Sequence, residues 1–308
     1  MRVCRFQYKS KIDFGFYTDH AVIPIQVVAS NAGVESPKIS SLLDLLPGGE
    51  HFSFAEELES KLSPEIVSDL GIAHSALKLL VPIPNPSKLL LLAGNYAKHI
   101  EEGGGKSEER EKTFPYVFMK PPSTTLTNPG DPIKIPACSP DQIDWELELG
   151  VVIGKRCSKV SEADALEYVA GYTVVNDISD RAFHPNPYRA ERPKDVFFDW
   201  LHGKWHDTFC PMGPCILSAS EVVDPQNLKL QLTLNGEIEQ DSSTAEMVFP
   251  VAAIIEFISS YVTLEPGDII STGTPSGVGK AKGKFLRVGD TVAATIGGIG
   301  CLVNPIAR

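Results

Sequence analysis

The sequence predicts an α+β protein that is mostly β, with a small N-terminal α/β domain and a larger second domain. Three observations support this prediction. Short apolar runs alternate with polar residues along the chain, few stretches have helical spacing, and a proline-rich segment interrupts the pattern near residue 81. The strands do not alternate regularly with helices, which argues against a doubly wound parallel sheet. At 308 residues the chain is long enough for two such domains.

The first 80 residues are expected to form the small domain. Strands are expected at residues 3–6, 14–17 and 21–28, and helices at residues 40–46 and 54–62. The segment Val81-Pro82-Ile83-Pro84-Asn85-Pro86 fits neither a helix nor a central strand, because its three prolines lack backbone donors. We therefore expect a boundary there, with domains at residues 1–80 and 81–308.

The larger domain is predicted to be rich in strands. Four leucines between residues 228 and 234 alternate with polar residues and lead into Asn235-Gly236, a strong signal for a β-hairpin. Further strands are expected at residues 88–93, 148–153, 172–175, 268–271 and 291–296, and helices at residues 162–169 and 251–261. These elements place most of the domain in sheets.

Composition excludes several classes of function. A net charge of -11 argues against nucleic acid or an acidic membrane surface as the main partner, although a local cluster of cations can still bind an anion. The six cysteines contain no C-x-x-C pair, so neither a zinc knuckle nor a disulfide scaffold is indicated. No apolar run approaches the ~20 residues of a membrane span. We expect a cytoplasmic protein with free thiols.

One strand carries two carboxylates in an otherwise apolar setting. Glu146 and Glu148 are two residues apart and therefore share one face of the strand, while Trp145 and Leu147 share the other. The continuation at residues 149–153 is apolar, as in a strand buried on both faces. A solvated edge strand is the commoner meaning of such a pair. Burial would instead require a cation, because neighbouring carboxylates repel and lose hydration.

A second apolar strand supports the prediction of a cation site. It ends in Asn176-Asp177, so a third carboxylate follows a buried strand. Three carboxylates form an oxygen-only site suited to Mg²⁺, Mn²⁺ or Ca²⁺, with coordination positions left for substrate and water. A turn-forming role at the end of the strand is the alternative for Asp177.

A candidate catalytic pair follows the first strand of the larger domain. His99 and Glu102 are three residues apart, so one helical turn brings them together. A carboxylate beside an imidazole orients the ring and raises its basicity, as a general base requires. Residues 103–112 are rich in glycine and charge and are typical of a mobile lid. The alternative is an exposed histidine on a helix that frays into a disordered loop.

Together these residues resemble the fumarylacetoacetate hydrolase family over residues 85–305. The motifs that carry the resemblance are Gly94-Asn95-Tyr96 with His99 and Glu102, Phe118-Met119-Lys120-Pro121, Glu146-Leu147-Glu148-Leu149 with Val152-Ile153-Gly154, Asp177-Ile178-Ser179 with Arg181, Gly203-Lys204, Asp207-Thr208-Phe209-Cys210-Pro211, Gly267-Asp268-Ile269-Ile270, Thr272-Gly273-Thr274-Pro275 and Gly277-Val278-Gly279. Each motif alone is weak, and their shared order and spacing carry the resemblance.

The resemblance implies a fold and a set of roles. The fold is a mixed β-sandwich roll, usually dimeric, with a small N-terminal domain. Glu146, Glu148 and Asp177 would bind Mg²⁺ or Mn²⁺, and His99 with Glu102 would activate water. The groups implied to bind substrate are Arg181, Lys204, Thr274 and, as a supporting charge, Lys120.

Two positions depart from the pattern of the family. Asn95 stands near the place where the larger hydrolases supply a further aspartate ligand, so the chain resembles the three-carboxylate branch. His184 stands where a substrate-binding glutamine is common, and the segment 185–200 after it is rich in aromatic and charged residues. Both departures lie where substrate would be bound, and we include His184 among the candidate substrate-binding residues.

The implied activity is hydrolysis of a C–C bond in a small 2-oxo or 2,4-dioxo acid of the acylpyruvate type, through a metal-stabilised enolate. Decarboxylation, isomerisation and a lyase reaction of the ureidoglycolate type share that enolate and remain alternatives. A non-catalytic, metal-stabilised dimeric binding protein is the alternative outside the enzymes. The expected partners are a small anionic 2-oxo acid and a second copy of the chain.

Overall fold

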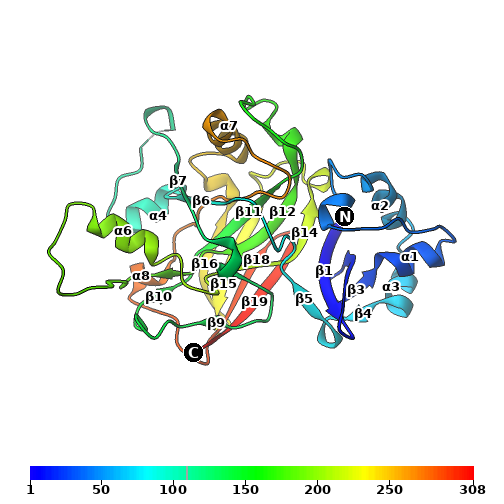
Figure 1. The fold of residues 1–308 in the computed structure, drawn as a ribbon, viewed down its shortest axis with the longest axis horizontal. Helices are drawn as coiled ribbons and strands as arrows, with labels where there is room; N and C mark the ends of the chain where they lie inside the picture. Colours follow the sequence, from blue (N-terminus) through cyan, green and yellow to red (C-terminus); the bar gives the residue numbers. More distant parts are fainter. Residues whose placement is uncertain (109) are drawn as a thin grey trace.

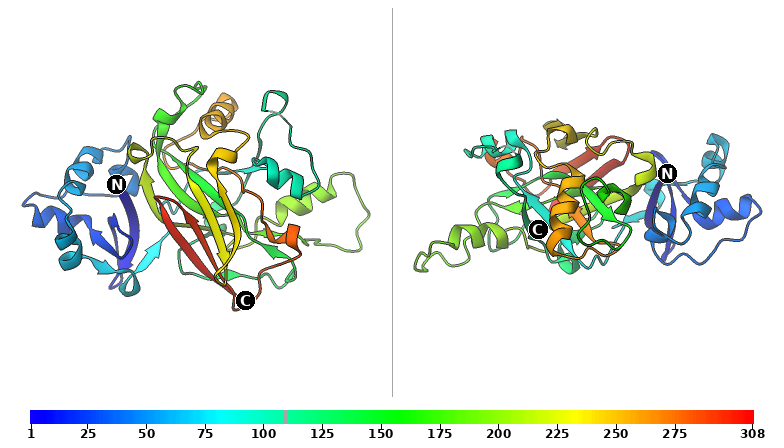
Figure 2. Two further views of the ribbon diagram at one scale, coloured as in Figure 1. Left: turned by 180° about the vertical axis from the view of Figure 1, so that it is seen from behind. Right: turned by 90° about the horizontal axis from the view of Figure 1, so that it is seen from above.

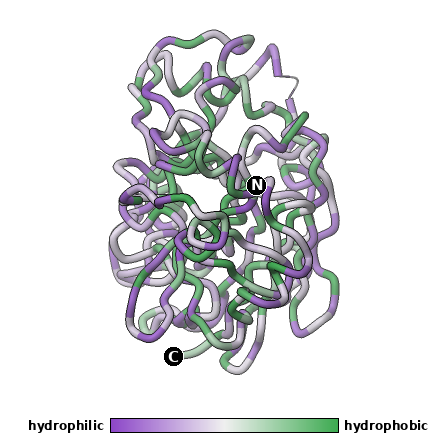
Figure 3. The backbone as a smooth tube through the Cα atoms, turned by 90° about the vertical axis from the view of Figure 1, so that its right-hand side faces the viewer, coloured by the Kyte–Doolittle hydropathy of each residue, from purple (hydrophilic) through white to green (hydrophobic). Residues whose placement is uncertain are grey.

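The structure is a computed structural model that describes residues 1–108 and 110–308. The N-terminal part lies at one end of the long axis of the molecule, and helices α4 (Ala97–Glu102) and α6 (Asp195–His202) lie at the other (Figures 1 and 2). Between them lie the sheets. Hydrophilic residues occur mostly in the peripheral loops (Figure 3).

A large mixed sheet runs through the whole molecule. Its strands follow the order β4-β3-β2-β1-β14-β12-β11-β17-β6-β7, with β5 paired to β1 and β8 paired to β14. The bounds are β1 Arg2–Tyr8, β2 Lys11–Tyr17, β3 Ala21–Pro24, β4 Ile72–Ala73, β5 Lys78–Leu80, β6 Leu89–Ala93, β7 Tyr116–Met119, β8 Leu126–Thr127, β11 Leu147–Ile153, β12 Val169–Asn176, β14 Cys210–Ser218 and β17 Ile269–Ser271. The strands expected at residues 88–93, 148–153, 172–175 and 268–271 are confirmed.

A second sheet faces the first. Its order is β16-β15-β18-β19-β9, and a short pair, β10 with β13, lies apart from both sheets. The bounds are β9 Ile133–Lys134, β10 Ile143–Asp144, β13 Ser179–Asp180, β15 Lys229–Leu234, β16 Glu237–Ser243, β18 Thr291–Ile296 and β19 Gly300–Ala307. The predicted hairpin joins β15 to β16, and both turn residues have positive φ, 53° at Asn235 and 86° at Gly236.

Two hydrophobic cores flank the large sheet. One lies between the two sheets, where Leu147 and Leu149 of β11 belong to the same cluster as Leu230 and Leu232 of β15. The other covers the opposite face, where Val152 of the sheet joins apolar residues of the N-terminal helices. The central strands are therefore buried on both faces, which explains their continuous apolar runs. The prediction of a mostly β sandwich with a small N-terminal α/β part is confirmed.

The helices agree in part with the sequence predictions. Their bounds are α1 Ile25–Asn31, α2 Phe52–Glu59, α3 Pro64–Leu70, α5 Pro122–Thr125, α7 Val251–Tyr261 and α8 Gly279–Lys282, in addition to α4 and α6. Helix α7 is confirmed, and α2 largely so. The 3₁₀ segments are η1 Leu42–Leu45, η2 His74–Ala76, η3 Arg110–Lys112, η4 Ala165–Tyr168, η5 Ala219–Glu221 and η6 Thr244–Glu246.

Three of the sequence predictions need correction. The helix expected at residues 40–46 is only the 3₁₀ segment η1, because Ser41 and Leu46 on either side of it are extended. The strand expected at residues 21–28 ends at Pro24, and helix α1 follows, because the buried residues Ile25, Val28 and Ala29 have helical spacing. The helix expected at residues 162–169 is only the 3₁₀ segment η4, because the chain enters β12 at Val169.

The N-terminal part shares the large sheet. Strand β1 pairs antiparallel with β14, and Arg2 and Val3 lie opposite Leu217 and Ile216. Residues 81–88 form no helix or strand, as expected from the prolines. A boundary at residues 80 and 81 remains a prediction, since strand pairing continues across it.

Candidate active site

The three predicted carboxylates meet where two paired strands are interrupted. Strand β11 pairs with β12, and the short strands β10 and β13 pair beyond them. Glu146 lies in the break just before β11, and Asp177 lies in the matching break just after β12. The Asp177 backbone N–H donates to the Glu146 carbonyl at 2.8 Å across this break. The interruption leaves both side chains free to turn toward Glu148.

This arrangement gathers a group that can hold a metal ion. One carboxylate oxygen from each of Glu146, Glu148 and Asp177 lies within 4.8 Å of the others, and all three residues are buried. An oxygen-only set of this kind suits Mg²⁺ or Mn²⁺ better than zinc, which prefers nitrogen and sulfur ligands.

The surroundings of Glu148 show whether a divalent cation fits the three carboxylates. Its Oε2 accepts hydrogen bonds from the Ser271 hydroxyl at 2.6 Å and the Gly273 backbone N–H at 2.9 Å. Its Oε1 is buried and has no hydrogen-bond partner among the described residues. Burial, together with the nearby carboxylates of Asp177 and Glu146, raises the pKa of Glu148 well above its usual value. A divalent cation would satisfy the unpaired oxygen and offset the repulsion, so the residues fit such an ion.

Lys204 connects two of the three carboxylates. Its Nζ donates to Glu146 Oε2 at 2.7 Å and to Asp177 Oδ2 at 2.6 Å, and the residue is 2% exposed. Burial alone would lower the pKa of Lys204, but the charges of Asp177 and Glu146 outweigh that effect and raise it. Lys204 therefore remains an ammonium ion. It follows α6, whose last turn leads into Gly203.

Two further cations support the carboxylates from other sides. Lys120, at the end of β7, contacts the Asp177 carboxylate and donates to the carbonyls of Ile178 at 2.9 Å and Phe209 at 2.5 Å. The guanidinium of Arg181 contacts Glu146 and donates through Nε to Asp144 Oδ2 at 2.9 Å. These cations fix the carboxylates in place.

Asp144 belongs to the site although the sequence analysis did not select it. Its carboxylate accepts from Arg181 and from the backbone N–H groups of Gly279 at 2.6 Å and Lys280 at 3.1 Å. It therefore holds the start of α8 against the carboxylate cluster. The spacing of two residues that links Glu146 and Glu148 also includes Asp144, and this signal could have identified it.

The charges of the cluster nearly balance. Four carboxylates and three cations gather there: Asp144, Glu146, Glu148, Asp177, Lys120, Arg181 and Lys204. If all of them are ionised, the negative charges exceed the positive ones by a single charge, and a divalent ion would reverse the sign. Burial raises the pKa of Glu146, but Lys204 and Arg181 outweigh it and hold that pKa below its usual value. The cluster is thus suited to an anionic ligand once a divalent ion is present.

The predicted catalytic pair is formed in the structure. His99 and Glu102 lie on α4, and His99 Nδ1 is 2.8 Å from Glu102 Oε1. The backbone N–H of Gly277 donates to both oxygens of Glu102, at 2.9 and 3.2 Å. Burial raises the pKa of Glu102, but the hydrogen bonds from His99 and Gly277 outweigh it and lower the pKa. A charged Glu102 therefore orients the imidazole and ties α4 to the glycine-rich turn.

Thr274 lies beside this turn and is held by a second residue that the sequence analysis did not select. Its hydroxyl donates to the Leu147 carbonyl at 2.9 Å and accepts from Gln240 Nε2 at 2.9 Å. Gln240 is fully buried, and its Oε1 accepts from the Leu147 backbone N–H at 3.0 Å. A lone glutamine on a hairpin strand gives no sequence signal for this role.

Five of the predicted residues line one cavity, which we call the charged pocket. It has a volume of about 190 Å³ and is lined by Leu92, Ala93, Gly94, His99, Glu146, Arg181, Trp200, Lys204 and Thr274. The pocket thus brings His99 close to the carboxylate cluster. Glu102, Glu148, Asp177 and Lys120 lie behind this lining and contact the residues in it or one another.

His184 lies elsewhere. Its Nδ1 is 3.2 Å from Asp199 Oδ2, and Arg189 contacts the same carboxylate. The side chain is 47% exposed and is absent from the lining of the charged pocket. The structure places it on the loop before α6, and its role in substrate binding remains a prediction.

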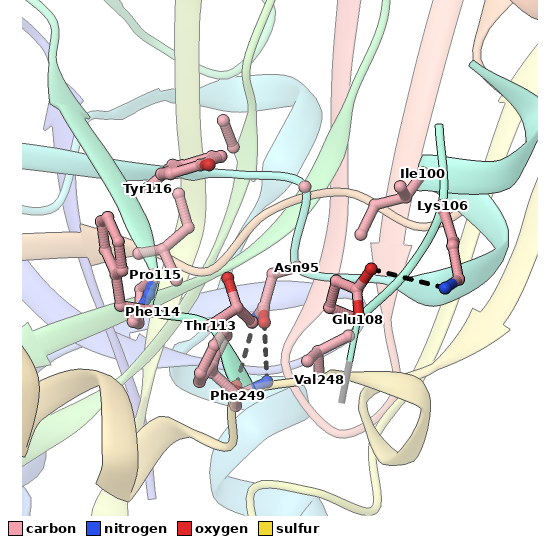
Figure 4. A pocket seen from close by; sticks show the side chains of 13 residues that line it. Asn95, Ile100, Lys106, Glu108, Thr113, Phe114, Pro115, Tyr116, Val248 and Phe249 are labelled. Atoms are coloured by element: carbon pink, nitrogen blue, oxygen red, sulfur yellow. Dashed lines mark hydrogen bonds and ion pairs between the residues drawn. The ribbon is translucent and has the colours of Figure 1, made fainter. Parts of the chain in front are cut away.

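A neighbouring cavity of about 320 Å³ shares Leu92, Ala93 and Gly94 with the charged pocket (Figure 4). Asn95 and Phe249 line this cavity, as do Lys106 and Glu108 of the predicted lid. Residue 109 of the lid, whose range is 103–112, lies outside the described residues. Movement of the lid remains a prediction.

Asn95 is a structural clamp in this fold. Its amide nitrogen donates to the carbonyls of Thr272 at 2.8 Å and Phe249 at 3.1 Å, and its oxygen accepts from the Phe249 backbone N–H at 2.8 Å. All three bonds are buried. The clamp joins β6 to the segment after β17 that carries Thr274.

The variant Asn95→Asp is therefore expected to destabilise the protein rather than add a metal ligand. An aspartate loses two donors and places a charge against two carbonyl oxygens, which costs about 2–5 kcal/mol of unfolding free energy. Denaturant unfolding measures this change. Asn186→Asp is the matched control, because Asn186 is exposed and its side chain accepts a hydrogen bond from the Tyr188 backbone N–H, which an aspartate can still accept. Tighter binding of Mg²⁺ without loss of stability would contradict the clamp.

A buried group of carboxylates, lysines and a His–Glu pair, gathered around one pocket of a β-sandwich, is the arrangement of an enzyme active site. The family follows from the comparison of sequences. Residues 88–307 match the model of the fumarylacetoacetate (FAA) hydrolase C-terminal domain. The chain belongs to the fumarylacetoacetate hydrolase family.

Several relatives are similar over most of the chain. The oxaloacetate tautomerase YisK of Bacillus subtilis (strain 168) is 40% identical over 272 residues, which cover 86% of each chain. The 2,4-didehydro-3-deoxy-L-rhamnonate hydrolase of Sphingomonas sp. (strain SKA58) is 40% identical over 237 residues, 76% of this chain and 78% of the other. A maleylpyruvate hydrolase from Sphingobium sp. SYK-6, solved with manganese(II) and pyruvate, has a TM-score of 0.73 and 26% identity, and the match covers 100% of this chain and 99% of that one.

These findings establish an enzyme family whose members include tautomerases and hydrolases. Across residues 1–108 and 110–308, none of the helices has the length and apolar character needed to cross a lipid bilayer.

Proposed function

We propose that the protein is a divalent-metal-dependent enzyme that moves a proton between carbon and oxygen of a small 2-oxo acid, with a four-carbon dicarboxylate of the oxaloacetate type as its substrate. The observation that carries the proposal is the charged pocket itself, where one base faces a cluster of cations and carboxylates in about 190 Å³. That volume equals roughly six molecules of liquid water, which suits a small acid. The similarity to YisK supports the reaction type.

The residues of the chain have distinct tasks in this reaction. Mg²⁺ or Mn²⁺ bound by Glu146, Glu148 and Asp177 would polarise the 2-oxo group as a Lewis acid. Lys204 and Arg181 line the pocket and supply positive charge for a substrate carboxylate.

His99 is the group that moves the proton. Its Nδ1 is occupied by Glu102, so Nε2 remains to take a proton from the carbon next to the 2-oxo group and to return one. Glu102 fixes the tautomer of the ring and stabilises the imidazolium that forms.

Hydrolysis of a C–C bond in a 2,4-dioxo acid is the second candidate. The same His99–Glu102 pair can take a proton from water, which then attacks the distal carbonyl. The relatives named as rhamnonate-type and maleylpyruvate hydrolases support this reaction. The two candidates differ in whether water enters the product.

Two assays separate the candidates. The first follows conversion of enol-oxaloacetate to the keto form by its ultraviolet absorbance, with Mg²⁺, Mn²⁺ or a chelator. The second follows release of pyruvate from acylpyruvates under the same conditions. Tautomerisation well above the uncatalysed rate without pyruvate release supports the first candidate. Activity that is unchanged by chelator contradicts both.

Replacement of His99 tests the base. The variant His99→Gln is expected to lower kcat by about 10²–10⁴-fold, because general acid–base catalysis typically contributes that factor. Binding of Mn²⁺ should remain, since His99 is separate from the acidic triad. Calorimetric titration of Mn²⁺ and steady-state kinetics measure the two effects.

A second variant serves as the control for that change. His20→Gln replaces an exposed histidine in the N-terminal part and should leave kcat unchanged. If His99→Gln retains full turnover, the assignment of the base is wrong.

Assembly and location complete the proposal. We propose a homodimer in the cytoplasm, and light scattering on the purified protein tests the dimer. Val196 and Phe198 of α6 are 83% and 43% exposed, and this apolar surface supports an interface.

A further inference from the structure

Another cavity, distinct from the one of about 320 Å³, also shares wall residues with the charged pocket. We call it the aromatic groove. It has a volume of about 520 Å³, and its walls include Phe114, Tyr116, Phe197, Phe257 and Tyr261. The groove and the charged pocket have two wall residues in common, Ala93 and Trp200.

Trp200 forms the bulky part of this common wall. It lies on α6, and its ring packs edge-to-face against Phe118 with ring centroids 5.0 Å apart. Phe197 packs at 5.8 Å from the same ring. Lys204 Nζ lies 5.8 Å from the centroid of the Trp200 ring. The indole is thus held by aromatic rings of the groove and contacts the ammonium ion that binds the carboxylate cluster.

The wall separates two chemical environments. Beside Lys204 the pocket contains charged groups, whereas the groove beyond is lined mainly by aromatic side chains. The ring of Trp200 favours an adjacent cation through its π-face and also suits apolar neighbours. Ala93, the other common residue, has too small a side chain to form a barrier.

We propose that Trp200 is a specificity-determining residue that limits the substrate to a short 2-oxo acid by closing the charged pocket toward the aromatic groove. The inference rests on the proposed function, because it assumes that the head group of a 2-oxo acid binds in the charged pocket. A substrate with an apolar tail meets the indole, whereas a short acid fits within about 190 Å³. Removing the indole joins the two cavities and gives an apolar tail a favourable place.

The test uses binding as well as turnover. Straight-chain 2-oxo acids with three to eight carbons are titrated calorimetrically into the Mn²⁺-loaded protein. The proteins compared are the wild type, Trp200→Ala, Trp200→Leu and Tyr261→Ala. Tyr261 lines the groove but not the charged pocket and is 58% exposed, so it is the matched control.

The expected result is a change in the dependence on chain length. In the wild type and in Tyr261→Ala, affinity should fall beyond four or five carbons. In Trp200→Ala, affinity for the longer acids should rise instead, by about tenfold for each added methylene that enters the groove. Trp200→Leu should give an intermediate dependence, and it replaces the alanine variant if circular dichroism shows that the latter is unfolded.

The inference is wrong if affinity depends on chain length in the same way in the wild type and the Trp200 variants. It is also wrong if the wild type binds the longest acids as tightly as pyruvate. The proposed function fails separately, if the wild type binds 2-oxo acids but turns over none of the tested substrates. In that case the binding profiles still decide the role of Trp200. If even pyruvate fails to bind, the charged pocket is not the site of the head group and both ideas are wrong.

Discussion

Replacing Glu148 by glutamine is expected to abolish the thermal stabilisation of this protein by Mg²⁺ or Mn²⁺ and to lower kcat/KM by about 10³-fold or more. The unpaired Oε1 of Glu148 is the oxygen that a cation would take, and a neutral amide places either a weaker ligand or an NH₂ group there. Loss of about 4 kcal/mol of charge stabilisation in the transition state corresponds to that factor.

The metal-free Glu148→Gln protein should be at least as stable as the metal-free wild type. The substitution removes a carboxyl group whose charge is opposed by burial, Asp177 and Glu146. The amide oxygen can still accept from Ser271 and Gly273. A ligand at 100 times its Kd stabilises a protein by about 2.7 kcal/mol, and this increment should be absent in the variant.

Differential scanning fluorimetry with and without Mn²⁺ measures both parts of this prediction. Glu246→Gln is the matched control, because Glu246 forms an exposed ion pair with Lys98 and is not part of the triad. A metal-induced shift of Tm in Glu148→Gln equal to that of the wild type would show that the ion binds elsewhere.

The second large effect is expected for Lys204→Met. Lys204 is buried and donates to both Glu146 and Asp177, so its removal leaves two buried carboxylates with less compensation. Breaking a buried ion pair by removing one partner typically costs about 3–5 kcal/mol of unfolding free energy. Activity should also fall, because the charged pocket loses a positive charge from its lining.

A surface lysine gives the comparison for this variant. Lys282→Met removes a partner of Glu239 from a side chain that is 40% exposed, and it should cost at most about 1 kcal/mol. Urea unfolding of both variants without added metal separates the two costs. Added Mn²⁺ should restore part of the stability lost in Lys204→Met, since the ion supplies the missing charge. If both variants lose the same small amount, the buried lysine is not needed to balance the cluster.

The sequence allowed the prediction of most strands and of the chemical groups of the site. Alternation in β15 and the apolar runs of β11 and β12 are local signals, and they locate these elements well. The His99–Glu102 contact is also local, because it needs only one helical turn. The end of β3 at Pro24 was missed, because the apolar residues that continue into α1 suggest a longer strand.

The partners of each charge could not be predicted, because they depend on the fold. Lys120 reaches Asp177 over 57 positions in sequence, and Asn95 reaches Phe249 over 154. No spacing rule connects residues so far apart. From the sequence, Lys204, Arg181 and Lys120 were expected to bind substrate. In the structure, each of them contacts an acidic side chain of the site. Gln240 gave no signal for the same reason, and Trp200 was indicated only as part of the aromatic segment 185–200.

The pairing of β1 with β14 has a consequence for any shortened form of this protein. A chain that began at residue 81 would lose β1 and leave part of β14 as an open sheet edge, with apolar residues such as Ile216 no longer covered. Open edges of this kind recruit strands from other molecules and favour aggregation. Truncation is therefore a poor way to isolate the catalytic part, even though the pocket lies at the opposite end of the molecule.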